Sequence, residues 1–294
     1  MNESTKEITE QLQAFIDEQV KRGHTPSLDE LNMFVQKKTN EHNTNPQDKF
    51  NGFTSEQMYY LINKPFEEGC PIQLCKIKDQ DIEDIPFLKQ ALYLMHLLDK
   101  NELKLTAQGY IPPKIVTELY EMGLQDCYSN YYKQKIEPRV EVVQVLRTAL
   151  ESCGYIKVRT GKMSLTTKGQ KILNDGNAIF QELMRFMFLN FNVACFDLVP
   201  NQEVANVGRL YSLWLVHHYG GEWRDQNFYA EMYFKAFPNI GPFNVYGYRT
   251  FCRLFHYIGI CEINDTENDK GLNFGKYTRK RYILDRIFSF TEPK

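Results

Sequence analysis

Two adjacent histidines, His217 and His218, lie near Glu222 and form the densest group of metal-ligand side chains in the sequence. Helical spacing would place His218 and Glu222 on one face. A zinc site still needs a third or fourth ligand, and Gly220-Gly221 interrupts the helix where that geometry is required. The pattern is more typical of a helix C-terminus, where histidines lie beside the last carbonyl groups. We therefore expect no metal at His217 or His218.

Cys70 and Cys75 are five positions apart and could form half of a zinc ribbon, but the sequence has no second pair at metal-binding spacing. The acidic run over residues 79–84 lacks the glycine and the closing glutamate of a calcium loop, so it resembles the polar start of a helix. We expect buried thiols at these cysteines, and neither a metal nor a cofactor.

Catalytic motifs are missing from the sequence. It contains no nucleophile-elbow motif, no P-loop and no glycine-rich dinucleotide motif. Histidines are present, but none lies in a local signature with a cysteine nucleophile. These observations predict that the protein is not an enzyme.

Basic side chains concentrate in the second part of the chain. Residues 1–130 carry 13 basic and 21 acidic side chains, whereas residues 131–294 carry 22 and 16. Lysine and arginine that gather on one surface bind nucleic acid by releasing counterions from the phosphates. We therefore predict a surface that binds duplex DNA or another nucleic acid, formed by the following residues: Lys157, Arg159, Lys162, Arg249, Arg253, Lys276, Arg279, Lys280 and Arg281.

Three serine or threonine residues are each followed three positions later by glutamate or glutamine, the pattern of a capping box. These predicted helix starts lie at Ser4, Ser27 and Thr54. A polar stretch with Pro46 follows the second helix and indicates a linker.

Internal similarity gives the clearest indication of the fold. Residues 103–109 align with residues 163–169, and each segment follows an amphipathic helix. A weaker third version matches residues 259–263 with 154–158, and 277–280 with 165–168. The clearest copy predicts a helix over 139–152, a strand, a tight turn at 160–162 and a returning strand. Helix, hairpin and helix in this order resemble the second half of a winged-helix unit, with the hairpin as the wing.

The expected architecture is mainly α with short β-hairpins, an α+β protein built from tandem winged-helix-like modules behind an N-terminal helical region. The predicted boundaries are 1–45 for the helical region, 46–125 for a first helix–hairpin–helix module, 126–190 for a second winged-helix-like module and 191–294 for a C-terminal one. We also expect residues 86–120 and 139–173 to superimpose as helix–hairpin–helix units.

Residues 50–58, 63–66 and 71–74 resemble an uncharacterised bacterial family, and residues 103–120 and 225–237 resemble it as well. Relatives in that family sometimes carry a SEC-C-type zinc tail, a pattern that the last residues here do not have. The resemblance implies no known activity, so it assigns no site residues.

Length and composition are those of a globular protein, with 294 residues of which 43% are hydrophobic. The first residues do not have the pattern of a secretory signal, and the most apolar stretch, 180–199, is too polar for a membrane span. We expect a cytoplasmic protein that does not bind membranes. The leading prediction is nucleic-acid binding or a regulatory role; the alternative is a scaffold that binds a protein partner.

Overall fold

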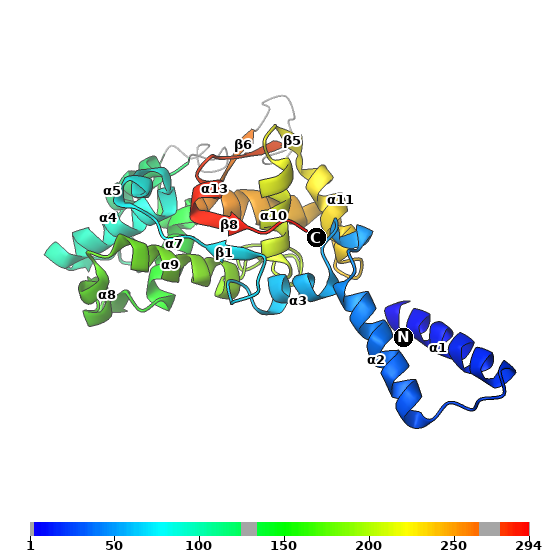
Figure 1. The fold of residues 1–294 in the computed structure, drawn as a ribbon. Helices are drawn as coiled ribbons and strands as arrows, with labels where there is room; N and C mark the ends of the chain where they lie inside the picture. The colour runs from blue at the N-terminus through cyan, green and yellow to red at the C-terminus, as the bar shows by residue number, and fades with distance from the viewer. Residues whose placement is uncertain (1–2, 125–133, 265–276, 294) are drawn as a thin grey trace.

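A computed structural model describes residues 3–124, 134–264 and 277–293, and these ranges are mainly helical with short antiparallel strand pairs (Figure 1). The predicted α+β class is therefore confirmed. In the three described ranges, no helix combines the length and the apolar character that a membrane span requires.

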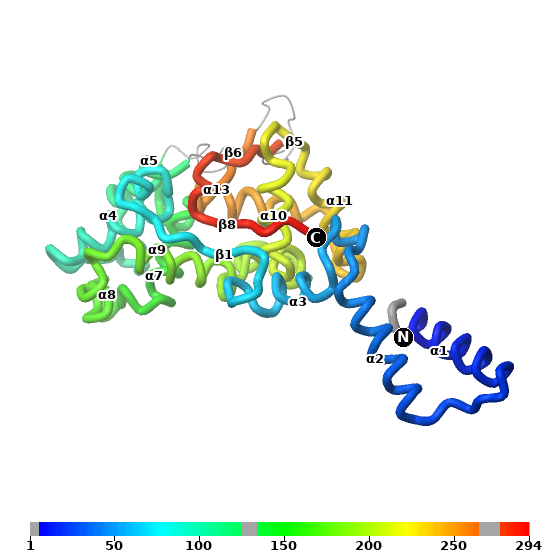
Figure 2. Tube along the Cα trace, in the orientation of Figure 1, coloured from blue at the N-terminus to red at the C-terminus, as the bar shows by residue number. Residues whose placement is uncertain are grey.

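The chain begins with an antiparallel helical hairpin that projects from the rest of the molecule (Figures 1 and 2). Its helices are α1 (Glu3–Lys21) and α2 (Leu28–Thr44). The predicted box at Ser27 is present, because its hydroxyl accepts from the backbone of Glu30 and the Glu30 carboxylate accepts from the backbone of Ser27. The predicted start at Ser4 is wrong, because α1 already includes Glu3.

The first unit of the body runs helix, strand, helix, helix, strand, strand. Its elements are α4 (Pro86–Lys100), β2 (Leu103–Lys104), α5 (Pro113–Met122), α7 (Glu141–Ser152), β3 (Ile156–Arg159) and β4 (Lys162–Leu165). The three strands form one antiparallel sheet in which β4 lies between β2 and β3. The hairpin predicted around residues 160–162 is therefore present as β3 and β4.

The position of strand β2 differs from the one that the predicted modules require. Leu103 pairs with Met163, and Lys104 pairs with Lys162, so residues 103–104 and 162–163 are neighbours in one sheet. The predicted boundary at 125/126 does not separate two hairpins, and residues 86–120 contain only one described strand. Both segments have the alternating pattern of a half-buried strand, which explains why they resemble each other in sequence.

A second unit repeats the same order of elements. Its elements are α10 (Arg209–Tyr219), β5 (Arg224–Asp225), α11 (Gln226–Ala236), the π-helical η6 (Tyr248–Phe255) with its α-helical continuation α12 (His256–Ile258), β6 (Cys261–Asn264) and β7 (Tyr277–Lys280). Strand β7 lies between β5 and β6, as β4 lies between β2 and β3. The internal repeat thus comprises residues 86–165 and 209–280, a longer period than the sequence alignment indicated.

The remaining elements connect the hairpin and the two units. They are η1 (Asp48–Phe50), α3 (Ser55–Asn63), β1 (Ile72–Leu74), η2 (Asp79–Asp84), η3 (Glu137–Arg139), α8 (Thr167–Ile172), α9 (Gly176–Arg185), η4 (Phe186–Asn190), η5 (Phe243–Val245), α13 (Leu284–Ile287) and β8 (Phe288–Phe290). The predicted capping box at Thr54 begins α3. Strands β1 and β8 pair antiparallel, which ties the end of the chain to the segment before the first unit.

The third helix of the second unit, η6 with α12, lies in the middle of the body (Figure 1). Every residue from Arg249 to Cys261 is buried. Glycine at 259 ends α12 in the left-handed region, at φ 93°, and an added Cβ there would lie 2.2 Å from Pro86 of α4. The two units therefore share one continuous core, and this helix is inaccessible from outside.

Candidate nucleic-acid interface

One face of the first sheet carries a row of cations. Lys104 on β2 lies opposite Lys162 on β4, and Lys162 lies opposite Arg159 on β3. Lys157 projects from the same face of β3, two residues from Arg159. All four side chains are exposed, whereas Met163 and Ile156 point into the core. We call these four residues the cationic sheet face.

A two-residue turn fixes the register of this row. Thr160 and Gly161 both have positive φ, 48° and 71°, which is the backbone of the turn that best matches the twist of paired strands. The turn sets Arg159 directly across from Lys162. Because β4 in turn pairs with β2, the turn also aligns Lys104 with the other two cations.

Like charges directly opposite one another destabilise a sheet, by roughly 0.2–1 kcal/mol for each pair. Lysine on an edge strand has a common structural explanation, since it prevents pairing with other chains. That explanation covers Lys104 and Arg159, which lie on the two edge strands, but not Lys162 on the central strand. A ligand that brings negative charge would offset the repulsion.

Glu102 supplies one counter-charge near the cationic sheet face, with its carboxylate 2.9 Å from the ammonium group of Lys162. Both side chains are more than half exposed, so the pair contributes little to stability. For Lys104, Lys157 and Arg159, the described part of the chain contains no ion pair. The face therefore has a positive excess of three charges.

The predicted cations at the end of the chain are neutralised individually. Arg279 is 2.8 Å from Glu262 and lies over the ring of Trp223. Lys280 is 2.7 Å from Asp285 and also donates to a backbone carbonyl of α10.

Arg281 donates to the backbone carbonyls of Asp84 and Gly259, at 3.1 and 2.6 Å, and so connects the end of η2 to the end of α12. Lys276 lies outside the described residues. The cations around Arg279 therefore do not form a second row like the one on the first sheet.

Arg249 and Arg253 were expected on the same binding surface, and this placement is wrong. Their side chains are 0% and 2% exposed. Arg249 makes two parallel bonds of 2.8 Å to the Asp197 carboxylate. Arg253 lies 2.7 Å from Glu141 and 3.1 Å from Asp197. Arg253 joins the two units through Glu141 of α7, Arg249 ties the second unit to the segment before it, and neither buried arginine can reach a phosphate.

Tyrosines complete the buried network. The hydroxyls of Tyr248 and Tyr257 donate to the Glu141 carboxylate, at 3.0 and 2.8 Å. Burial raises the pKa of Asp197, but the bonds and charge of Arg249, the backbone N–H of Val199 and the bond from Arg253 together outweigh it and hold that pKa below its ordinary value of 3.8. The stability that this pair contributes is thus complete above that ordinary value, and it is lost as the pH falls through the lowered pKa.

The residues considered for metal binding lie in separate places. His217 stacks on Phe290, with ring centres 3.8 Å apart, and its Nδ1 is 2.6 Å from Asp285. Cys70 is buried and Cys75 is half-buried on either side of β1. Among the residues that the structure describes, no three histidine, cysteine or acidic side chains come together in a way that could hold a metal ion.

Sequence reasoning missed Lys104 on the cationic sheet face and Asp197 in the buried network. The sequence did contain a signal for Lys104. Residues 103–105 alternate apolar, basic and apolar, and residues 163–165 alternate in a similar way. Asp197 gave no signal, since it lies in a loop 52 residues before Arg249.

Comparisons with known proteins add nothing to this geometry. No family model, no curated protein and no solved structure matches the chain.

Proposed function

We propose that the protein binds nucleic acid through the cationic sheet face of its first unit. The observation that carries this proposal is the aligned row of Lys104, Lys162 and Arg159 on three adjacent strands. Double-stranded DNA carries one negative charge for roughly every 1.7 Å of its axis, so a row of neighbouring cations can neutralise several phosphates together.

The topology supports the same proposal. Helix, strand, helix, helix, strand, strand, with the last strand between the other two, is the order that a winged-helix unit would have. On this interpretation β3 and β4 form the wing, and the wing is the part that carries Lys157, Arg159 and Lys162. A fold alone does not define a function, so the proposal depends on the charges of the wing.

The third helix of each unit is the element that would enter the major groove in a winged-helix protein. In the second unit this helix is buried, and in the first unit most of α7 is buried as well. Arg147, on the more open side of α7, is held by Glu137 and Glu151. Contacts to phosphates position a protein without specifying a sequence. The protein would therefore bind nucleic acid with little sequence preference.

A substitution at Lys104 separates binding from folding. Lys104→Glu replaces a like-charge pair with Lys162 by an opposite-charge pair, so we expect the free energy of unfolding in urea to rise by about 0.5 kcal/mol. The same change should weaken binding to a labelled duplex by about tenfold at low salt, since one phosphate contact is reversed. Lys76→Glu, at an exposed position before η2, is the matched control and should change neither quantity. Unaltered binding by the Lys104 variant would count against the proposal.

A panel of unrelated duplexes tests the lack of sequence preference. We expect dissociation constants within about threefold of one another in fluorescence anisotropy at constant salt, because the contacts involve phosphates alone. A protein that reads bases binds its target sequence with an affinity roughly a thousandfold or more above that for random sequence. One sequence preferred to that degree would show that a helix reads the bases.

A further inference from the structure

Much of the surface of the α1–α2 hairpin is not covered by other parts of the protein. No side chain of α2 is buried, and none of the described side chains of α1 is buried either. Its main internal contact is the stacking of Phe15 on Phe34, with ring centres 4.4 Å apart. Most of the stability of a helix in a protein comes from packing of its apolar face. The hairpin also extends away from the body, which contacts it only near its foot, where α2 meets α3 (Figures 1 and 2).

Helical geometry divides the hairpin into two faces. The half-buried side chains are Ile8, Gln11, Leu12, Phe15, Ile16 and Gln19 on α1, and Leu31, Phe34, Val35, Lys38, Thr39, Glu41 and His42 on α2. At helical spacing, the midline of the contact between the helices runs along Ile8, Leu12, Phe15 and Gln19, and along Leu31, Phe34, Lys38 and His42. An α-helix turns by about 100° per residue, so residue numbers show which side chains lie on either side of the contact. On each helix we take the flank that is reached by turning away from the contact in the direction in which the helix winds. Because the helices are antiparallel, these two flanks lie on the same face of the hairpin.

This face carries no charge. Its members are Thr9, Leu12, Ile16 and Val20 on α1, and Leu28, Asn32, Val35, Thr39 and Asn43 on α2. We call these residues the uncharged face. Val20 is 56% exposed and Leu28 is 73% exposed, which is unusual for aliphatic side chains on one stripe.

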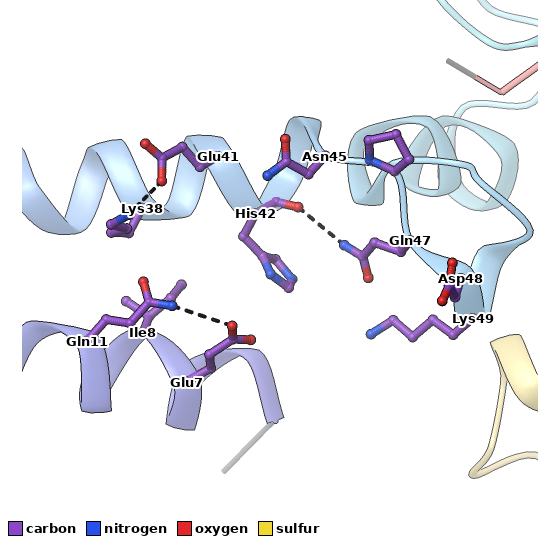
Figure 3. A pocket seen from close by; sticks show the side chains of 11 residues that line it. Glu7, Ile8, Gln11, Lys38, Glu41, His42, Asn45, Gln47, Asp48 and Lys49 are labelled. Carbon is purple, nitrogen blue, oxygen red and sulfur yellow. Dashed lines mark hydrogen bonds and ion pairs between the residues drawn. The ribbon is translucent and has the colours of Figure 1, made fainter.

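The opposite face of the hairpin is charged. Its members include Glu7, Glu18, Glu30, Lys37 and Glu41. Figure 3 shows part of this face, where Glu7 and Gln11 of α1 lie across from Lys38, Glu41 and His42 of α2 around a polar hollow of about 460 Å³. Finding Glu7 and Glu41 at one hollow agrees with the assignment of the two faces.

We propose that the uncharged face binds a second copy of this chain, forming an antiparallel four-helix bundle. The hairpin as a whole is acidic, with five basic and eight acidic side chains in residues 3–44. A basic partner would therefore bind the charged face, whereas two uncharged faces meet without repulsion. Asparagine within an apolar helical contact fixes register, a role that Asn32 can perform.

Size and shape fit this partner. The helices are about 28 Å long and 10 Å wide, so the face offers roughly 550 Å² per copy, and two copies approach the lower end of the range for specific interfaces. A hollow of about 510 Å³ lies at the foot of the hairpin, lined by Asn43, Tyr59 and Tyr60 among others. In the antiparallel arrangement the tip of one hairpin, with Leu28, lies at the foot of the other.

Sedimentation equilibrium of the full chain between about 1 and 100 µM tests the proposal, which does not depend on nucleic-acid binding. We expect the mass to rise from 34.7 kDa toward twice that value, with a micromolar dissociation constant. Val20→Glu with Leu28→Glu should keep the protein monomeric. The matched control is Ala14→Glu with Met33→Glu, which adds the same charges at exposed positions off the uncharged face and should dimerise normally.

A charge exchange tests the antiparallel arrangement. Leu28→Glu alone and Tyr59→Lys alone should each weaken the dimer, and an equal mixture should restore it through the Glu–Lys contact. Circular dichroism checks that the helices persist. A wild-type chain that stays monomeric at 100 µM would overturn the proposal, as would equal dimer loss in the two double variants. A mixture that restores nothing would overturn the tip-to-foot arrangement.

Discussion

Replacing Arg253 with methionine is expected to lower the free energy of unfolding by about 3–5 kcal/mol, because it leaves Glu141 without a cation in a largely buried site and removes one of the two arginines that contact Asp197. Urea unfolding followed by circular dichroism measures this loss. Arg249→Met should also lower it, since Asp197 loses its two-bond partner and keeps only the 3.1 Å contact with Arg253. An exposed arginine whose role is to bind phosphate would change stability by no more than about 0.5 kcal/mol.

Two further variants show whether the loss at Arg253 comes from unpaired charge. Combining Arg253→Met with Glu141→Gln removes both partners, so it should restore part of the stability. Arg279→Met is the matched control, because its ion pair with Glu262 is half-exposed and contributes less than about 1 kcal/mol. If Arg253→Met and Arg279→Met lower the free energy of unfolding equally, the buried, central position that the structure gives to Arg253 is contradicted.

Reversing three charges on the cationic sheet face should strongly weaken binding to nucleic acid. We expect the combined Lys104→Glu, Arg159→Glu and Lys162→Glu variant to bind a 20-base-pair duplex at least 100-fold more weakly than wild type at 50 mM salt, because three phosphate contacts become repulsive. The fold should remain intact, since all three side chains are exposed and the apolar residues beneath them are unchanged.

Net charge needs its own control, because the triple variant is more acidic by six charges. Lys37, Lys76 and Lys235 are exposed and lie on α2, before η2 and on α11. Replacing these three with glutamate changes the net charge by the same amount but leaves the cationic sheet face intact. This variant should keep most of its affinity; a loss as large as that of the first variant would mean that overall charge governs binding.

The β3–β4 hairpin was predictable from the sequence because its evidence is local. Alternating residues on each side of Thr160-Gly161 specify two strands and a tight turn, and β3 and β4 form as predicted. The partner of β2 was not predictable, because Lys104 and Lys162 are 58 residues apart and no local pattern selects one strand over another. The sequence similarity predicts part of the repeat, but it places β2 and β4 in separate hairpins rather than in one sheet.

The arginines show a different limit. Arg249 and Arg253 are four residues apart on a helix, a spacing that is the same whether the partner is a phosphate or a buried carboxylate. What decides between these cases is Asp197 in a distant loop and Glu141 at the start of α7. Their approach depends on how the two units pack, which periodicity does not encode.

The salt dependence of binding tests the central claim most directly. Three to four phosphate contacts predict that the logarithm of affinity for duplex DNA falls with the logarithm of salt concentration at a slope of about −3 to −4, or roughly 100-fold in affinity between 50 and 200 mM. The triple variant of the cationic sheet face should flatten that slope by about three. Anisotropy at four salt concentrations gives both slopes. Wild-type protein that fails to bind at 50 mM salt, or a slope that the triple variant leaves unaltered, would contradict a nucleic-acid interface on this sheet.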